Sequence, residues 1–167
     1  MNVVRDWLLA EFDQEMALTR QVLERVPDSA FSWSPHERSM QLGGLATHLA
    51  LLPHWGSAIL DHDEYDLTAA EGKTPAMQHN SAEVLHTFDG YVTSLRKGLL
   101  NRTDAELHAP WTLRQGTRTL MSMPRFAALR TFLLSHTIHH RGQMTVYLRL
   151  QNVALPPLYG SSADESM

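Results

Sequence analysis

The chain of 167 residues carries 14 Lys and Arg, 18 Asp and Glu, ten His and no Cys. This length predicts one domain, spanning residues 1–167, that is large enough to bury a core. The absence of Cys excludes disulfides, thiolate nucleophiles and every Cys-based metal site, so a transition metal would need His, Asp or Glu ligands. The formal net charge of -4 argues against a nucleic-acid-binding surface.

The hydropathy of the chain predicts a globular, cytoplasmic protein. Hydrophobic residues make up 43% and charged residues 19%, which is ordinary for a folded domain. No apolar run approaches the ~18 residues that a transmembrane helix needs. The first residues include charged side chains instead of an apolar signal core. We therefore expect no membrane partner.

The first half of the chain predicts two long helices. Residues 3–26 place apolar side chains at three- and four-residue steps, which is the α-helical period. Pro27 ends this segment, and an irregular connector follows it. A second helix is predicted from about Ser39, as N-cap, to Leu60. Pro53 lies inside it and should kink the helix or interrupt one backbone hydrogen bond.

The middle of the chain predicts a loop and a third helix. Acidic residues dominate residues 61–75, which we interpret as a solvated loop, with a carboxylate metal site as the less favoured alternative. A helix is predicted over residues 81–101, with Ser81 as its cap. Thr103 and Glu106 then form a capping-box pattern that opens a short helical turn.

The last third predicts one more long helix and completes the fold class. Residues 111–123 alternate weakly around Gly116, which leaves a small hairpin and an irregular loop as alternatives. Pro124 suits the first position of a helix that runs to about Gln151, and the tail from Leu155 should lie back over it. Four helices of roughly twenty to thirty residues predict an all-α, antiparallel four-helix bundle with at least one crossover connection.

The last helix holds the strongest chemical signal. A single stripe at four- and three-residue steps should face the bundle. Its members are Leu129, Leu133, His136, His140, Gln143, Tyr147 and Leu150. His136 and His140 occupy its centre, one turn apart, a spacing at which two imidazoles can reach one metal ion. His139 could pair with His136 instead, but it lies toward the flank of the stripe, so we favour His140.

A third ligand should come from another helix, and the second helix offers His48. This residue lies in the middle of the apolar stripe of that helix. His54 is six residues farther on, about 120° away around the helix, and should not share the face. The other five His fall in connectors, in loops or on a polar helix side: His36, His62, His79, His86 and His108.

A lone His on an apolar face is more often a hydrogen-bonded core residue than a ligand. Three neutral imidazoles in one apolar core are costly to bury without partners, and a metal removes that cost. Three His ligands leave a coordination position open, as in zinc enzymes, although imidazole also suits nickel, copper and iron. The di-iron Glu-x-x-His signature is missing, and Thr137 stands where the His-Glu-x-x-His peptidase motif has Glu.

Four pieces of the sequence resemble one known family. They are residues 45–50, Trp55, residues 134–144 and the tail 157–165. In this order, and over nearly the whole chain, they resemble the DinB/YfiT-like superfamily. The resemblance implies an antiparallel four-helix bundle, often dimeric, with a single metal ion held by three His.

By motif position, the ligands that the resemblance implies are His48, His136 and His140, and His139 is not one of them. The same three residues follow from the helix stripes. Some members of the superfamily are thiol-dependent transferases or isomerases, and others have no known activity. The family name refers to induction by DNA damage and not to DNA binding.

These observations favour a metal-dependent transferase that acts on a small-molecule substrate. A divalent metal, zinc or nickel, would bind a low-molecular-weight thiol cosubstrate, and the lack of Cys fits a nucleophile that comes from outside. Metal-dependent hydrolysis is the runner-up reaction. The alternative of another class is a non-catalytic, metal-stabilised bundle that serves in stress response.

Three further residues are candidates for the walls of a pocket: Gln143, Tyr147 and Trp55. For each, ordinary packing or a hydrogen bond to a ligand residue is an equally good interpretation. Arg141 points away from the His stripe and should pair with a carboxylate, either within the chain or across a dimer interface. The homodimer itself is implied mainly by the family resemblance.

Overall fold

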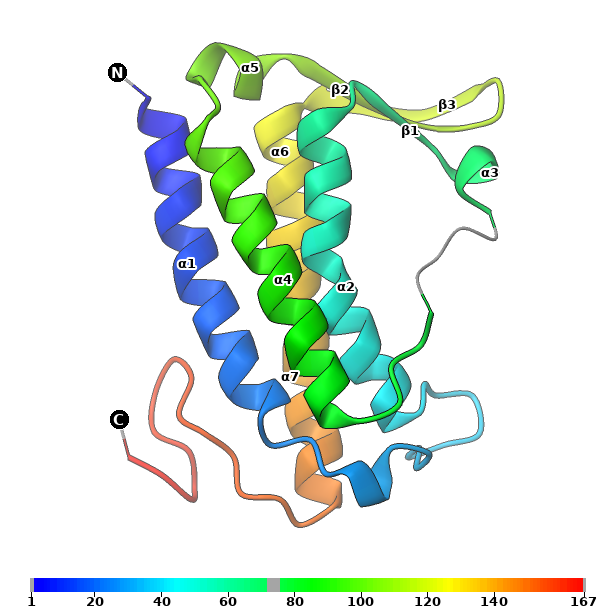
Figure 1. The fold of residues 1–167 in the computed structure, drawn as a ribbon, viewed down its shortest axis with the longest axis vertical. Helices are drawn as coiled ribbons and strands as arrows, with labels where there is room; N and C mark the ends of the chain where they lie inside the picture. Colours follow the sequence, from blue (N-terminus) through cyan, green and yellow to red (C-terminus); the bar gives the residue numbers. More distant parts are fainter. Residues whose placement is uncertain (1, 72–75, 167) are drawn as a thin grey trace.

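The computed structural model describes residues 2–71 and 76–166. Within them, four long helical segments lie side by side (Figure 1). They are α1 (Val3–Leu23), α2 (Leu42–Asp61), α4 (Ser81–Leu100) and a composite last segment. The last segment joins α6 (Arg125–Leu129), the π-helical turn η2 (Arg130–Ser135) and α7 (His136–Leu150). The predicted four-helix bundle is confirmed.

The bundle has two helices in each direction. α1 and α7 run one way, whereas α2 and α4 run the other way (Figure 1). α2 packs against α4 and α7, and α1 packs against the same two helices. The connection from α2 to α4 returns along the length of the bundle, which is the predicted crossover. Among the described residues, no helix is long and apolar enough to cross a membrane.

A small sheet closes one end of the bundle (Figure 1). It contains β1 (Glu64–Asp66), β2 (Pro110–Gln115) and β3 (Arg118–Pro124), in that order. β2 and β3 form an antiparallel hairpin around Gly116, which has a φ of +58°, so the hairpin alternative is confirmed.

The interpretation of residues 61–75 as a loop was wrong in part. β1 pairs in parallel with β2, and the short helix α3 (Leu67–Ala70) follows it directly. The pairing joins segments about fifty residues apart, so no local pattern signals it. Residues 72–75 lie outside the described residues.

Two of the predicted helix caps were wrong for physical reasons. α2 begins after Gln41 and not at Ser39, because the carbonyls of Trp33 and Phe31 accept the N–H groups of its first two residues. At α4, the side chain of Asn80 accepts from the third helical N–H, so Ser81 is the first helical residue.

Of two further predictions for helix starts, the first is confirmed and the second was wrong by one position. The capping box of Thr103 and Glu106 is confirmed at the start of α5 (Asp104–His108). Pro124 stands directly before the last helical segment, one position earlier than predicted.

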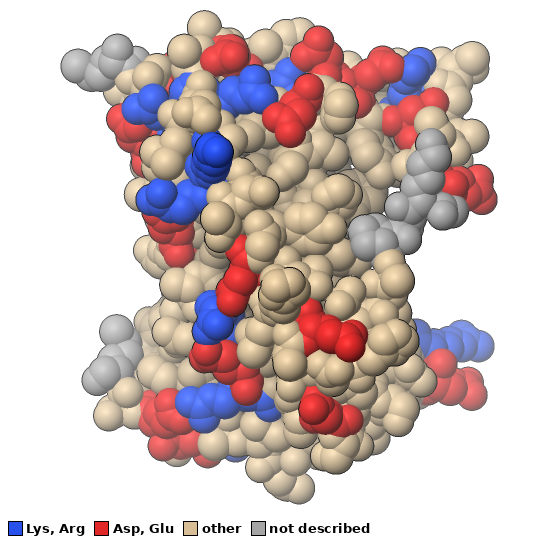
Figure 2. Space-filling model, viewed as in Figure 1, with Lys and Arg blue, Asp and Glu red and all other residues tan. Residues whose placement is uncertain are grey.

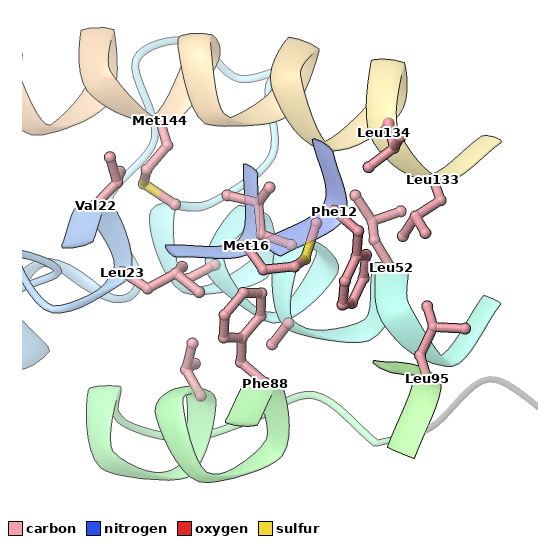
Figure 3. Close-up of a cluster of buried hydrophobic side chains, with 14 of the residues drawn as sticks. Phe12, Met16, Val22, Leu23, Leu52, Phe88, Leu95, Leu133, Leu134 and Met144 are labelled. Atoms are coloured by element: carbon pink, nitrogen blue, oxygen red, sulfur yellow. The ribbon is translucent and has the colours of Figure 1, made fainter. Parts of the chain in front are cut away.

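Apolar side chains from all four helical segments meet in one core (Figure 3). Phe12 and Met16 of α1 point toward Leu52 of α2 and Phe88 of α4. α2 continues through the buried Pro53. On the surface, charges of both signs are interspersed over α1 and α4 (Figure 2), and the pairs Arg20–Asp89 and Arg96–Asp13 join these two helices.

A buried arginine closes the carboxyl end of α2. The Arg125 guanidinium donates to the carbonyl oxygens of Ile59, of Leu60 at 3.3 Å and of His62 at 2.6 Å. It also donates to the Asp63 carboxylate at 2.6 Å. A cation at this end satisfies the free carbonyls and complements the helix dipole. Arg125 thereby fixes α2 against the last helical segment. These two helical segments contain the three His residues predicted as metal ligands.

Candidate metal centre

Three His side chains meet between α2 and α7. The Nε2 atom of His136 lies 3.3 Å from Nε2 of His48 and 2.9 Å from Nε2 of His140. One ligand atom from each residue lies within 4.8 Å of the other two. Within residues 2–71 and 76–166, this is the one group of three or more His, Asp or Glu placed to share a metal ion.

Neighbouring groups fix which ring nitrogens can bind a metal. His140 Nδ1 lies 2.9 Å from the amide oxygen of Gln143, which can only accept, so Nδ1 donates and Nε2 keeps its lone pair. The amide nitrogen of Gln143 donates in turn to the Tyr147 hydroxyl at 3.4 Å. Gln143 therefore orients His140, and Tyr147 orients Gln143.

The surroundings of His48 and His136 favour the neutral form of these two imidazoles. Burial, followed by the charges of His140 and His136, lowers the pKa of His48 to about 4. Burial also lowers the pKa of His136, although a hydrogen bond with the backbone of Phe132 acts in the opposite direction. Only the neutral imidazole can coordinate a metal, so these surroundings prepare both rings at neutral pH.

The donor set fits a divalent metal. Because Gln143 occupies Nδ1 of His140, Nε2 of this ring carries a lone pair and lies 2.9 Å from Nε2 of His136. A divalent cation accepts lone pairs of this kind from imidazole Nε2 atoms. A tetrahedron with metal–nitrogen bonds of ~2.1 Å has edges of about 3.4 Å, and the His48–His136 separation of 3.3 Å is close to this value.

The three rings are half-buried, whereas the other seven His are exposed. The expectation that His136 and His140 occupy the centre of the buried face was wrong. The fully buried side of this segment carries Leu133, Thr137, Arg141, Met144 and Leu148. Leu150, which we expected to be in the stripe, is 55% exposed.

The π-helical turn η2 (Arg130–Ser135) explains this difference. Its i→i+5 hydrogen bonds take in one more residue than an α-helical turn, so every residue after it is rotated around the axis. The buried positions consequently run 129, 133, 137 and 141, in steps of four. His136 and His140 are shifted to the edge where α7 meets α2, and the cluster is open to solvent on one side.

The remaining His lie apart from the cluster. His139 is exposed, and its ring stands edge-on to His140 with centroids 4.8 Å apart. His54 is exposed on α2 and lies against Tyr91 of α4, at 4.9 Å. His108, which we expected in a loop, is the last residue of α5.

Of the candidate pocket residues, Gln143 is hydrogen-bonded to a member of the cluster. Tyr147 is buried and stands edge-on to Trp33, at 5.7 Å. Trp55 is half-buried and packs on Tyr65 of β1, at 4.8 Å. The sequence analysis did not predict that Trp33 and Tyr65 pack against two of these candidates. An aromatic residue in a polar connector is a signal that could have indicated such packing.

Arg141 forms a second polar cluster on another side of α7, toward α1. Its guanidinium donates to the Glu15 carboxylate at 2.5 Å and to the Glu15 carbonyl at 2.9 Å. Tyr159, from the tail, donates its hydroxyl hydrogen to the same carboxylate at 2.7 Å. The prediction that Arg141 pairs with a carboxylate is confirmed, and the partner lies within the chain.

The sequence profile of the DinB family matches residues 1–166. The chain belongs to the DinB family. Two solved DinB-like proteins are similar in fold. The YjoA structure from Bacillus subtilis has a TM-score of 0.71 at 18% identity, with 92% of this chain and 96% of that chain covered. A protein from Bacillus cereus ATCC 10987 has a TM-score of 0.70 at 22% identity, with coverages of 91% and 95%.

One curated protein is similar in sequence over a short stretch. It is the uncharacterized protein YrdA of Bacillus subtilis (strain 168), 45% identical over 38 residues. The match spans 23% of this chain and 23% of the length of YrdA. These similarities support the family and the fold. None of the three similar proteins is described by an activity.

Proposed function

We propose that this DinB-family chain is a metal-dependent transferase that uses a low-molecular-weight thiol. His48, His136 and His140 would hold one divalent ion, with zinc and nickel as the best candidates. The observation that carries the proposal is the half-buried position of three imidazole side chains, with ligand atoms within 4.8 Å of one another, at an open edge between α2 and α7. An open edge leaves room for a ligand from solvent.

The residues around the cluster have separate tasks. When bound, the ion supplies a positive charge that favours the deprotonated form of a thiol. The chain itself keeps His48 neutral by burial, and Gln143 fixes the tautomer of His140. Because the chain has no Cys, the sulfur nucleophile has to come from the cosubstrate.

The composition of the cluster favours transfer over hydrolysis. Metal-dependent hydrolases of the His-Glu-x-x-His type use a carboxylate as general base. The group of three His contains no carboxylate among the described residues. Thr137, at the position of that Glu, is buried and turned away from solvent. The half-exposed rings also disfavour a closed, purely structural site.

We further propose, on the family resemblance, that the chain acts on a small molecule and forms a homodimer.

Metal analysis tests the ligand set. The protein is purified without a His tag, and bound metal is measured for wild type, His140→Ala and His139→Ala. We expect wild type and His139→Ala to bind one ion per chain. Removal of a hydrogen-bonded neighbour of a ligand already costs about 10–100-fold in affinity, so loss of the ligand in His140→Ala should cost more than that. Equal metal content in both variants would contradict the assignment.

Titration of thiols tests the reaction class. A cobalt-substituted sample is titrated with 2-mercaptoethanol and with glutathione, and the visible and near-ultraviolet spectrum is recorded. A sulfur-to-cobalt charge-transfer band supports the transferase. Bound cobalt with no response to either thiol would refute the transferase and favour the hydrolase. A wild type that binds no metal would refute both.

A further inference from the structure

Gly44 is a glycine of α2 that neither conformation nor packing explains. It lies in the third position of the helix, and Gly116 is the described glycine with a positive φ. Glycine destabilises a helix interior by about 1 kcal/mol relative to alanine. A Cβ atom built at Gly44 meets no heavy atom within 4 Å. The position therefore has room for a side chain and carries none.

Two other helical glycines, Gly56 and Gly98, have a packing reason. A Cβ at Gly56 would lie 2.5 Å from a methyl carbon of Leu95, and one at Gly98 would lie 2.8 Å from a methyl carbon of Leu60. These two residues let α2 and α4 approach closely. Gly90 of α4 and Gly142 of α7, both exposed, have open space like Gly44. Gly44 differs from Gly90 in its neighbours.

Gly44 lies one helical turn before His48 and on the same side of α2. Residues at i and i+4 are neighbours on a helix surface, with Cβ atoms about 5–6 Å apart. Helical side chains lean toward the N-terminus, so the His48 ring covers the turn that contains Gly44. The open space at Gly44 consequently adjoins the three-His cluster.

The opposite wall of this space belongs to α7. α2 and α7 run in opposite directions (Figure 1), so the turn before His48 lies level with the turn after His140. That turn of α7 carries Gln143, which is half-buried. The antiparallel arrangement therefore places a bare backbone on α2 level with an amide side chain on α7.

We propose that the space over Gly44 receives the non-coordinating body of the ligand that binds at the three-His cluster. The missing side chain at position 44 then sets the largest ligand that the site admits. This inference rests on the proposed function and deepens it, because it favours a thiol with a bulky body over the smallest thiols. Gly44 is thus a specificity-determining residue.

Size-graded ligands of the cobalt-substituted protein test the proposal. Wild type, Gly44→Ala, Gly44→Leu and Gly90→Leu are titrated with imidazole and with 4-phenylimidazole, and then with 2-mercaptoethanol and glutathione. We expect Gly44→Leu to weaken the bulky member of each pair by at least about tenfold and the small member by less than about twofold. Gly44→Ala should give a smaller effect of the same sign, and Gly90→Leu should change neither ligand.

The melting temperatures of the variants and the use of both imidazoles and thiols distinguish a loss of folding, a failure of the transferase proposal and a failure of the Gly44 proposal. Alanine and leucine are better helix formers than glycine, so the melting temperature of each variant should rise and not fall. If Gly44→Leu binds both sizes as wild type does, or loses both equally, the proposal is overturned. If imidazoles bind and thiols do not, the proposed transferase fails, while the imidazole pair still decides the role of Gly44.

Discussion

Two polar clusters lie on different sides of α7, and consecutive residues contribute to them. Arg141 points to Glu15 and Tyr159 and is 1% exposed. His140 points to His136 and His48, and all three rings are half-buried. The Arg141 cluster joins opposite charges and holds α1, α7 and the tail together. The His cluster joins three rings of one kind and is the candidate ligand site.

The Arg141 cluster is internally satisfied. The Glu15 carboxylate accepts from both Arg141 and Tyr159, and Arg141 also donates to the Glu15 carbonyl and to Thr19. The hydrogen-bonding groups of the Arg141 cluster are thus taken up by one another and not by a further ligand. The His cluster instead brings together three half-buried ring nitrogens that are placed to share a metal ion.

The largest expected effect is the loss of Glu15. Glu15→Ala leaves the Arg141 charge buried and unpaired, which should reduce the free energy of unfolding by about 3–5 kcal/mol. Urea denaturation at neutral pH measures this change. Asp13→Ala is the matched control, since Asp13 lies two residues away on α1 and pairs with Arg96 on the surface. Its cost should stay below about 1 kcal/mol. Equal costs would mean that the Arg141 cluster is no stronger than a surface pair.

The second prediction concerns the link between Gln143 and His140. Gln143→Ala removes the acceptor that fixes the His140 tautomer, so metal affinity should fall about 10–100-fold. Competition with a chromogenic chelator measures the affinity. Thr145→Ala, which removes a hydroxyl bonded to its own helix, should leave the affinity unchanged. An unchanged affinity in Gln143→Ala would show that His140 is positioned without this amide.

The third prediction concerns Tyr159. Tyr159→Phe keeps the ring beside Arg141, whose Cζ atom lies 5.2 Å from the ring centroid. It removes a hydroxyl that donates to the Glu15 carboxylate and accepts from the Arg141 guanidinium. The expected loss of unfolding free energy is about 1.5 kcal/mol. Metal affinity should not change. A fall in metal affinity would show that the two sides of α7 are coupled.

The smallest effect is a pH dependence of the metal-free protein. Because the pKa of His48 is about 4 in the folded state, the unfolded chain binds this proton first as the pH falls. Stability is therefore fully present above about pH 6.5 and declines toward about pH 4, by about 1 kcal/mol for a half-exposed ring.

Urea denaturation at about pH 7.5 and about pH 5 measures this decline, because these two conditions lie on either side of the ordinary pKa of a solvated His side chain. His48→Gln should lessen the difference between the two conditions. His54→Gln, on the exposed side of the same helix, should keep it. Identical declines in both variants would assign the pH dependence to other groups.

Helical spacing, together with the motif positions of the family, was sufficient to predict which three His come together, although not how deeply they are buried. His48, His136 and His140 were selected as the three His that share inward stripes, and the structure brings these three together. Their binding of a metal stays a prediction. The four long helices were also predictable, since each contains several turns of regular apolar spacing.

The rest depends on contacts that are distant in sequence. The carbonyls of Trp33 and Phe31 replace a side-chain cap at the start of α2, and no local pattern announces them. The choice of Glu15 as the partner of Arg141 spans 126 residues. The half-buried position of His136 follows from η2. A prediction that assumes a constant 3.6-residue period does not include the additional residue of a π-helical turn.

The π-helical turn has a consequence for how this protein tolerates insertions and deletions. Removal of one residue from 130–135 would restore α-helical spacing and rotate everything after it by about 100°, with a shift of about 1.5 Å along the axis. His140 would then turn away from His48, and Arg141 would turn away from Glu15. Both clusters depend on the same residue count. In this segment, chain length is therefore under a tighter constraint than the identity of the exposed side chains.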